Sequence, residues 1–300
     1  MLYAIIDIGS SIIKYKIYEY ANDNVEPVII HDKTMGLINY RKNNILTDEG
    51  IEVLLSTLNE FKKYSDKLNV DKSFYIATAS LRNIENREEV LTIVKTKLNI
   101  DIKIYTGEEE AENSFNSLKW VDTSSNDGIL VDIGGGSSEI TIFENQDKIL
   151  EQKSIPIGVL SIYNEDVSLL FPSKEEQQLI IDKTLDKIND LNIADYSKEY
   201  LYGIGKTFVS LKRLFEHMNI KKDKSNILTI EQVDIVLDKL STNTKENFKP
   251  ALIVDSERVH TMIPSLLITK ALSIRFNIKK IQVCDVTLQD GIILNVVKNI

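Results

Sequence analysis

The stretch "ILVDIGGGSSEITIFE", residues 129–144, places three consecutive glycines between two segments that have the patterns of β-strands. The apolar run 129–133 predicts a buried strand, and the alternation after the glycines predicts a second one. Glycine between paired strands is costly, because it loses much conformational freedom on folding. We therefore expect Gly134, Gly135 and Gly136 to let a ligand come very close to the backbone.

A second copy of this pattern opens the chain. The segment "AIIDIGSSIIKYKIYE", residues 4–19, has the same order of apolar strand, Asp-Ile-Gly, small residues and alternating strand. One copy begins each half, and strand patterns alternate with helix patterns in both halves, which is typical of the α/β class. We predict two duplicated α/β domains, 1–124 and 125–300, which face each other across a central cleft.

Periodicity predicts the remaining elements, and the polar segment 121–127 is the best linker candidate. We expect strands at 3–8, 13–17, 25–31, 73–79, 101–105, 148–155, 200–204 and 280–286. We expect helices from Thr47, at 87–98, 108–120, 173–191, 206–218, 229–240 and 263–276, and from Leu288.

Composition excludes several classes of protein. The chain has 300 residues, 43% of them hydrophobic, and a net charge of −9, which gives no basis for non-specific binding to nucleic acid or anionic lipid. The single cysteine, Cys284, fits a reducing compartment and is expected to be buried. The apolar start is interrupted by Asp7, Lys14 and Lys16, and no window reaches the ~18 apolar residues of a membrane span. We expect a cytoplasmic protein.

The two Asp-Ile-Gly turns have the composition of phosphate-binding turns. Their backbone N–H groups would form an anion-binding nest, and their serines add hydroxyl donors. The candidates are Gly9, Ser10, Ser11, Gly134, Gly135, Gly136, Ser137 and Ser138. The nearby acids Asp7, Asp132 and Glu139 repel phosphate, so they are expected to hold a bridging Mg²⁺ or Mn²⁺. The alternative is two tight hairpins with solvated acids.

A third glycine turn lies in "YLYGIGKTFVSL". Its Gly205-Lys206-Thr207 suggests a Walker A loop, but that motif needs a glycine where this chain has Tyr200. A strand followed by Gly203-x-Gly205 and a helix still predicts a phosphate or nucleotide contact at Gly205, Lys206 and Thr207.

Two further segments carry candidate catalytic groups. Glu108, Glu109 and Glu110 follow Gly107 at a predicted helix start, where acids complement the helix dipole. The alternative is that one of them is a general base. Arg82 follows a strand end, where its guanidinium either binds phosphate oxygens or forms a surface ion pair.

Over nearly the whole chain, these segments resemble the Ppx/GppA phosphatase family, the exopolyphosphatases and guanosine pentaphosphate phosphatases. That family belongs to the superfamily of sugar kinases, actin and heat-shock ATPases, and the length resembles its short two-domain members. The matching segments are Asp7–Ser10, Ala77–Arg82 with Asn86, Gly107–Ala111, Asp132–Glu139, Pro156–Gly158, Gly203–Thr207 and Asp285–Gly291. The resemblance implies two actin-like, ribonuclease H-like domains and a hydrolase of phosphoanhydride bonds.

The resemblance also implies roles for single residues. Glu110 matches the glutamate that activates the attacking water, and Arg82 matches a phosphate-contacting arginine. Asp132 and Glu139 match metal-linked acids of the second phosphate loop, and Asp7 matches their counterpart in the first. The implied substrate is inorganic polyphosphate or guanosine pentaphosphate, and a homodimer is a candidate assembly.

The chain departs from the family pattern at four places. The first loop reads Gly9-Ser10-Ser11-Ile12 where the family has Gly-Ser-Asn-Ser. Thr34 and Gln289 replace family arginines, and Lys206 replaces a glycine. The altered first loop favours a second hypothesis, a non-catalytic nucleotide- or phosphate-sensing module on the same fold. Glu110, Asp132, Glu139 and Arg82 favour the enzyme. A small-molecule kinase is a third reading, for which we find no acceptor-pocket signal.

Overall fold

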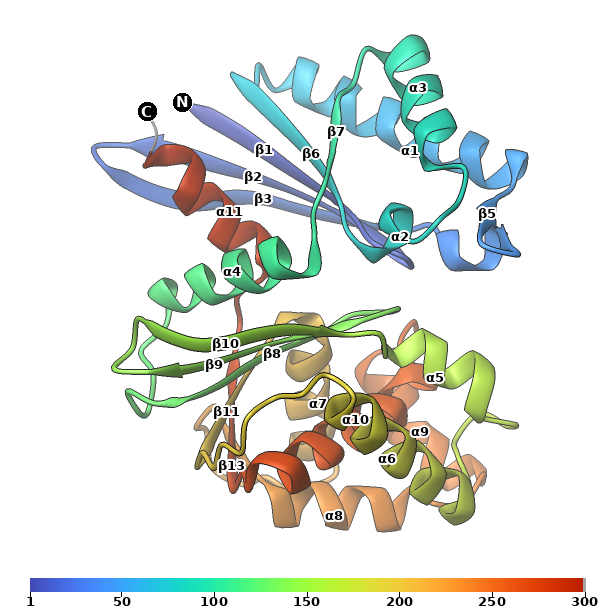
Figure 1. Ribbon diagram of the computed structural model, residues 1–300, viewed down its shortest axis with the longest axis vertical. Coiled ribbons are helices and arrows are strands. Elements are labelled where there is room, and N and C mark those ends of the chain that lie inside the picture. Colours follow the sequence, from blue (N-terminus) through green and yellow to red (C-terminus); the bar gives the residue numbers. More distant parts are fainter. Residues whose placement is uncertain (299–300) are drawn as a thin grey trace. The chain divides into compact units, whose positions relative to one another are not determined.

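The computed structural model describes residues 1–298 and consists of two compact units (Figure 1). Unit 1 combines Met1–Ser117 with the chain from Leu288 onward, and unit 2 is Leu118–Thr287. The predicted boundaries at 1–124 and 125–300 therefore need correction. The chain passes from unit 1 to unit 2 after Ser117, slightly earlier than predicted, and the helix from Leu288 onward belongs to unit 1 again.

Unit 1 is built on a five-stranded sheet in the order β3-β2-β1-β6-β7. Its strands are β1 (Leu2–Ile8), β2 (Ile12–Ala21), β3 (Asn24–Thr34), β6 (Lys72–Ala77) and β7 (Ile102–Ile104). The first three strands are antiparallel, and β6 runs parallel to both β1 and β7. A separate two-stranded ribbon is formed by β4 (Arg41–Lys42) and β5 (Ile45–Leu46).

Helices cover both faces of this sheet. They are η1 (Leu37–Tyr40), α1 (Asp48–Lys67), α2 (Ala79–Arg82), α3 (Arg87–Leu98), α4 (Gly107–Ser117) and α11 (Leu288–Val297). The Thr47 side chain accepts a hydrogen bond from the Gly50 N–H and so begins α1. Leu54, Leu58 and Phe61 of α1 lie in one apolar core with alternate residues of β1 and β2.

Unit 2 repeats the same topology. Its six-stranded sheet has the order β10-β9-β8-β11-β13-β12. The strands are β8 (Gly128–Ile133), β9 (Ser138–Glu144), β10 (Lys148–Ile155), β11 (Tyr200–Ile204), β12 (Ile227–Thr229) and β13 (Lys280–Cys284). Again the first three strands are antiparallel, and β11 runs parallel to both β8 and β13, while the edge strand β12 is antiparallel to β13. The predicted duplication of an α/β domain is confirmed.

The helices of unit 2 are η2 (Leu118–Trp120), α5 (Val159–Asp166), α6 (Lys174–Asn189), α7 (Gly205–His217), α8 (Ile230–Lys239), α9 (Lys245–Val254) and α10 (Val259–Phe276). In this unit the periodicity did not predict α5, α9, which contains Pro250, or the short strand β12. The buried Lys221 ammonium donates to the Ile227 carbonyl at 2.7 Å and so fixes β12. Cys284 is buried as predicted, and burial raises its pKa to about 12.

The C-terminal helix α11 belongs to unit 1 because its first turn docks on β1 and β2, and it lies beside α4 (Figure 1). The Gln289 amide donates to the Ile5 carbonyl at 2.7 Å and to the Lys14 carbonyl at 3.1 Å. At Gly291 a Cβ atom would lie 1.6 Å from the Asn113 carbonyl oxygen, so only glycine permits this helix crossing. Gln289 is thus a docking residue, at a position where the resemblance noted above implies an arginine.

A buried ion pair completes the docking of α11. The Asp290 carboxylate lies 2.5 Å from the Lys16 ammonium and accepts a hydrogen bond from the Tyr18 hydroxyl at 2.9 Å. Both charged residues are less than a tenth exposed. Lys16 and Tyr18 face away from the α1 side of the sheet, because strand side chains alternate between faces.

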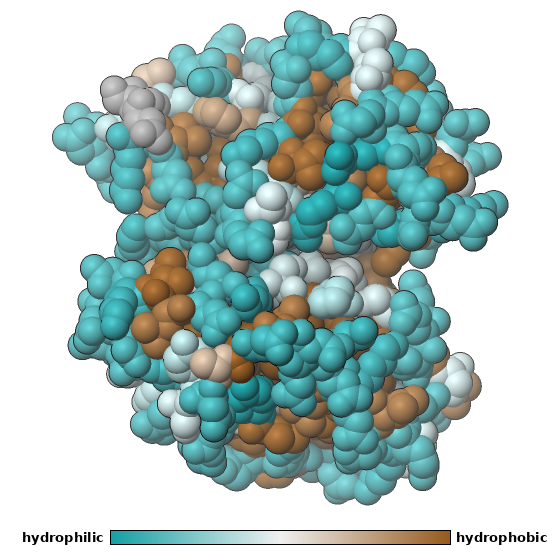
Figure 2. All heavy atoms as spheres, viewed as in Figure 1, coloured by the Kyte–Doolittle hydropathy of each residue, from teal (hydrophilic) through white to brown (hydrophobic). Residues whose placement is uncertain are grey.

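The surface mixes hydrophilic residues with scattered apolar ones (Figure 2). Among residues 1–298, none of the helices combines the length and the apolar character needed to span a bilayer.

Candidate active site

The two Asp-Ile-Gly turns have the same internal geometry. The Gly9 N–H donates to the Ile12 carbonyl at 3.1 Å, and the Gly134 N–H donates to the Ser137 carbonyl at 2.9 Å. A Cβ on Gly9 would lie 2.7 Å from the Ile12 oxygen, and one on Gly134 would lie 3.0 Å from the Ser137 oxygen. The first glycine of each turn is therefore explained by the close approach of the chain to itself.

The next residues of the second turn present N–H groups. The carbonyls of Gly134 and Gly135 accept hydrogen bonds from the first turn of α5, from Val159 N–H at 3.0 Å and Leu160 N–H at 2.9 Å. No residue in the described part of the chain accepts a hydrogen bond from the Gly135 or Gly136 N–H. Anion-binding nests are made of such successive amides, and phosphate binding at this turn stays a prediction.

Two carboxylate side chains lie opposite each other beside this turn. Asp132 and Glu139 are direct cross-strand partners of β8 and β9, so their side chains point to the same face. Glu139 is only 5% exposed, and its carboxylate accepts a hydrogen bond from the Ser154 hydroxyl at 2.8 Å. Two carboxylates directly opposite each other destabilise a strand pair. A divalent cation would relieve this repulsion.

The equivalent position in unit 1 has a different partner. Asp7 lies opposite Lys14, whose ammonium is 3.5 Å from one carboxylate oxygen. Burial raises the pKa of Asp7, and Lys14 partly opposes that shift. The other oxygen, Oδ1, is buried and has no hydrogen-bond partner among the described residues. That unpaired oxygen fits a metal ion or a metal-bound water.

The three glutamates at the start of α4 differ in environment. Glu109 closes a capping box, because its carboxylate accepts from the Thr106 N–H at 2.9 Å and its own N–H donates to the Thr106 hydroxyl at 3.1 Å. Glu108 is exposed. Glu110 is 5% exposed and is ion-paired with Arg82. The capping role therefore belongs to Glu109 alone.

Arg82 forms this pair largely out of solvent, with its side chain 20% exposed. Its Nη1 also donates to the Tyr105 carbonyl at 2.8 Å. The Nε and Nη2 donors have no partner within residues 1–298. Arg82 is thus not a surface ion pair, and it retains donors for an anion.

Two candidate hydroxyls are already engaged by the backbone. The fully buried Ser138 hydroxyl donates to the Ile157 carbonyl at 2.7 Å. The Thr207 hydroxyl donates to the Ile133 carbonyl at 3.1 Å and so joins α7 to the end of β8. We correct the predicted set accordingly, because neither hydroxyl remains to donate to a phosphate.

The third glycine turn lies against the second. Gly205 has φ +82, which favours glycine, and a Cβ there would lie 3.3 Å from the Asp132 carboxylate. Its N–H donates to the Val286 carbonyl at 2.8 Å, so Gly205 shapes the turn. Lys206 is exposed at the first turn of α7. Gly203 makes room for the ring of Phe208, which would lie 2.3 Å from its Cβ.

Sequence reasoning gave no role to two residues of the matching segments. The Asn86 side chain bonds both backbone groups of Leu46 at 3.0 Å and so holds β5. Gly158 lies against the glycine turn, where its Cβ would be 2.3 Å from the carbonyl carbon of Gly135. The segment Pro156-Ile-Gly158 was the available signal for the second of these.

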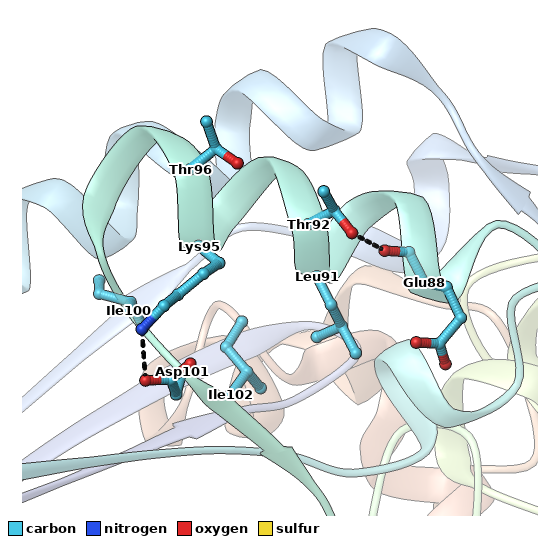
Figure 3. A pocket seen from close by; sticks show the side chains of 8 residues that line it. All are labelled: Glu88, Leu91, Thr92, Lys95, Thr96, Ile100, Asp101 and Ile102. Atoms are coloured by element: carbon cyan, nitrogen blue, oxygen red, sulfur yellow. Dashed lines mark hydrogen bonds and ion pairs between the residues drawn. The ribbon is translucent and has the colours of Figure 1, made fainter.

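A cavity of about 350 Å³ lies elsewhere in unit 1, between α3 and β7 (Figure 3). Its rim carries an ion pair between the Lys95 ammonium and the Asp101 carboxylate at 2.6 Å. None of the candidate site residues lines this cavity.

Two α/β units of one topology, each opened by a strand, a glycine turn and a strand, define a protein of duplicated α/β domains. The chain belongs to the Ppx/GppA phosphatase family, whose model matches residues 19–300.

Similarities to individual proteins are consistent with membership of this family. The chain is similar to Exopolyphosphatase 1 of Mycobacterium tuberculosis, with 23% identity over 259 residues, 83% of this chain and 74% of the relative. It is also similar to a bifunctional 3-dehydroquinate synthase/phosphatase of Fusobacterium nucleatum, with 27% identity over 90% of this chain and 42% of that protein. The crystal structure of an exopolyphosphatase from Cytophaga hutchinsonii shares the fold, with a TM-score of 0.87, 20% identity and coverage of 100% of this chain and 99% of the other.

Proposed function

We propose that this chain is a metal-dependent hydrolase that releases the terminal phosphate of inorganic polyphosphate or of guanosine pentaphosphate. One observation carries the proposal. A chain of a phosphatase family holds the buried carboxylate of Glu110 against an arginine with spare donors, Arg82. The Mycobacterium tuberculosis relative is named an exopolyphosphatase, and an Aeromonas hydrophila relative, 30% identical over 35% of this chain, is named a guanosine-5'-triphosphate,3'-diphosphate pyrophosphatase.

In the proposed reaction, water attacks the terminal phosphorus atom and the bond from phosphorus to the bridging oxygen breaks. Glu110 accepts the proton of that water as general base, a role that contributes roughly 10²–10⁴ in rate. The N–H donors that Arg82 retains would bind non-bridging phosphate oxygens in unit 1. In unit 2, the N–H groups of Gly135 and Gly136 are the candidate phosphate donors. Phosphoryl transfer needs such positioning and charge stabilisation more than covalent help.

The same carboxylates fit a divalent cation. Asp132 and Glu139 would hold Mg²⁺ or Mn²⁺ in unit 2, and Asp7 is the candidate metal-linked acid within unit 1. The described residues contain no group of three His, Cys, Asp or Glu side chains arranged for a metal. Phosphate oxygens and water would therefore complete the shell, as Mg²⁺ prefers. The metal supplies neutralisation of phosphate charge.

We predict that excess chelator abolishes phosphate release and that Mg²⁺ or Mn²⁺ restores it, because the paired acids otherwise repel the substrate. Glu139→Gln should raise the Mg²⁺ concentration needed for half-maximal activity. The matched control is Glu144→Gln at the far end of the same strand, β9. Full activity of the wild type in excess chelator would contradict the metal role.

Substrate class is tested by phosphate release from polyphosphate of several lengths and from guanosine pentaphosphate, for the wild type beside Glu110→Gln. Release from either substrate by the wild type alone supports the proposal. Binding without any turnover, measured by calorimetry, would instead assign a sensing role. We propose the cytoplasm as its compartment. We also propose a homodimer as its assembly, and light scattering of the purified chain checks that oligomeric state.

A further inference from the structure

We propose that Gly158 and the first turn of α5 are positioning residues, which hold the turn Gly134–Gly136 open toward phosphate. The inference rests on the proposed function, since it takes that turn as the anion site. The positioning groups are backbone groups of Gly158 and α5, which lie behind the turn.

The orientation of the turn follows from peptide geometry. In a trans peptide, the carbonyl of one residue and the N–H of the next point in opposite directions. The Gly134 carbonyl is held by Val159 N–H at 3.0 Å, so the Gly135 N–H points away from α5. The Gly135 carbonyl is held by Leu160 N–H at 2.9 Å and Ser161 N–H at 3.2 Å, so the Gly136 N–H does the same. The start of α5 thus sets the direction of both free donors.

Gly158 is what allows α5 to come this close. A Cβ there would lie 2.3 Å from the Gly135 carbonyl carbon and 2.4 Å from the Gly136 nitrogen, both backbone atoms that cannot yield cheaply. Its φ of −133 is open to any residue, so space alone demands the glycine. The Ser161 hydroxyl accepts from the Gly158 N–H at 2.9 Å and donates to the Gly158 carbonyl at 2.8 Å, which locks this residue in place.

Unit 1 has a similar arrangement at the equivalent place, although the carbonyls held there belong to the second and third residues of the turn and not to the first and second. After its third strand, Gly36 and η1 follow, and their N–H groups hold carbonyls of the first turn. The Gly36 N–H donates to the Ser11 carbonyl at 2.8 Å, and the Ile38 N–H donates to the Ser10 carbonyl at 3.0 Å. In both units, N–H groups of the segment after the third strand donate to carbonyls of the glycine turn. We therefore infer that this arrangement positions the turns.

Val159→Pro tests this role with little cost to the helix. Val159 is the first residue of α5, where proline is favoured, and the extended Gly158 backbone suits a following proline. The change removes the donor to the Gly134 carbonyl and places a ring carbon against it. Since a hydrogen bond contributes about 1 kcal/mol, we expect KM for polyphosphate to rise about five- to tenfold, with kcat within about twofold of the wild type.

The matched control is Lys245→Pro, at the first position of α9 and after the extended Thr244. It should leave KM, kcat and the thermal midpoint at wild-type values. Gly158→Ala must displace the turn backbone and should raise KM further than Val159→Pro. Unchanged KM in both Gly158→Ala and Val159→Pro would overturn the positioning role.

Calorimetry with inorganic tripolyphosphate and Mg²⁺ separates this inference from the proposed function. If the wild type binds but never turns over, and Val159→Pro binds about five- to tenfold more weakly, the positioning role stands and the hydrolase proposal fails. Equal affinity of wild type and Val159→Pro overturns the positioning role alone. A wild type that neither binds nor hydrolyses overturns both.

Discussion

Glu110→Gln should lower the rate of phosphate release by about 10² or more while the affinity for the phosphate ligand is kept. Glutamine preserves the size of the side chain and an acceptor for the Arg82 guanidinium, but it cannot take a proton from water. The effect should therefore fall on kcat. Single-turnover phosphate release and calorimetry with the same substrate measure the two quantities separately.

The neighbouring acids provide the controls for this experiment. Glu108→Gln alters an exposed side chain and should leave turnover near the wild type. Glu109→Gln keeps an oxygen that can accept from the Thr106 N–H, so the start of α4 should persist and turnover should again stay near the wild type. Three equal and small effects on turnover would exclude Glu110 as the base.

Lys16→Met should destabilise the protein by about 3–5 kcal/mol, because it leaves the Asp290 carboxylate buried and without its cation. The hydrogen bond from the Tyr18 hydroxyl carries no charge and cannot replace the lost cation. Urea unfolding of the full chain, followed by circular dichroism, measures the loss. The double change Lys16→Met with Asp290→Leu should recover most of it, because an apolar pair replaces the ion pair.

Lys95→Met is the matched control, since Lys95 forms an exposed ion pair with Asp101 in the same unit (Figure 3). Solvent weakens such pairs, so its unfolding midpoint should stay at the wild-type value. If Lys16→Met and Lys95→Met shifted unfolding equally, the buried pair would have no special part in docking α11.

Local patterns predicted the parts of the fold that local interactions determine. The paired strands β8 and β9, with their glycine turn, could be read from 129–144 because alternation and turn chemistry are encoded in neighbouring residues. The placement of α11 could not, since Gln289 bonds to Ile5 and Lys14 near the opposite end of the chain. Periodicity in the sequence carries no information about a contact between residues that lie so far apart in the chain.

The candidate site shows the same division. The segment after Gly107 predicted a helix start with a special glutamate, but only the fold distinguishes Glu109, which caps, from Glu110, which is buried beside Arg82. The hydroxyl of Ser138 looked available in the sequence and is used by a carbonyl of the β10–α5 connection. Whether the two glycine turns face one cleft stays a prediction.

Unit 1 contains segments from both ends of the chain. These segments therefore leave the ribosome at very different times during synthesis. Unit 2 is continuous and has left the ribosome in full when Leu288 emerges, whereas the sheet of unit 1 still lacks α11 at that moment. During this interval the face of β1 and β2 that receives Gln289 and Asp290 is bare. Nascent chains of this protein therefore carry a finished second unit beside an incomplete first one, the state in which a chaperone or a protease would meet them.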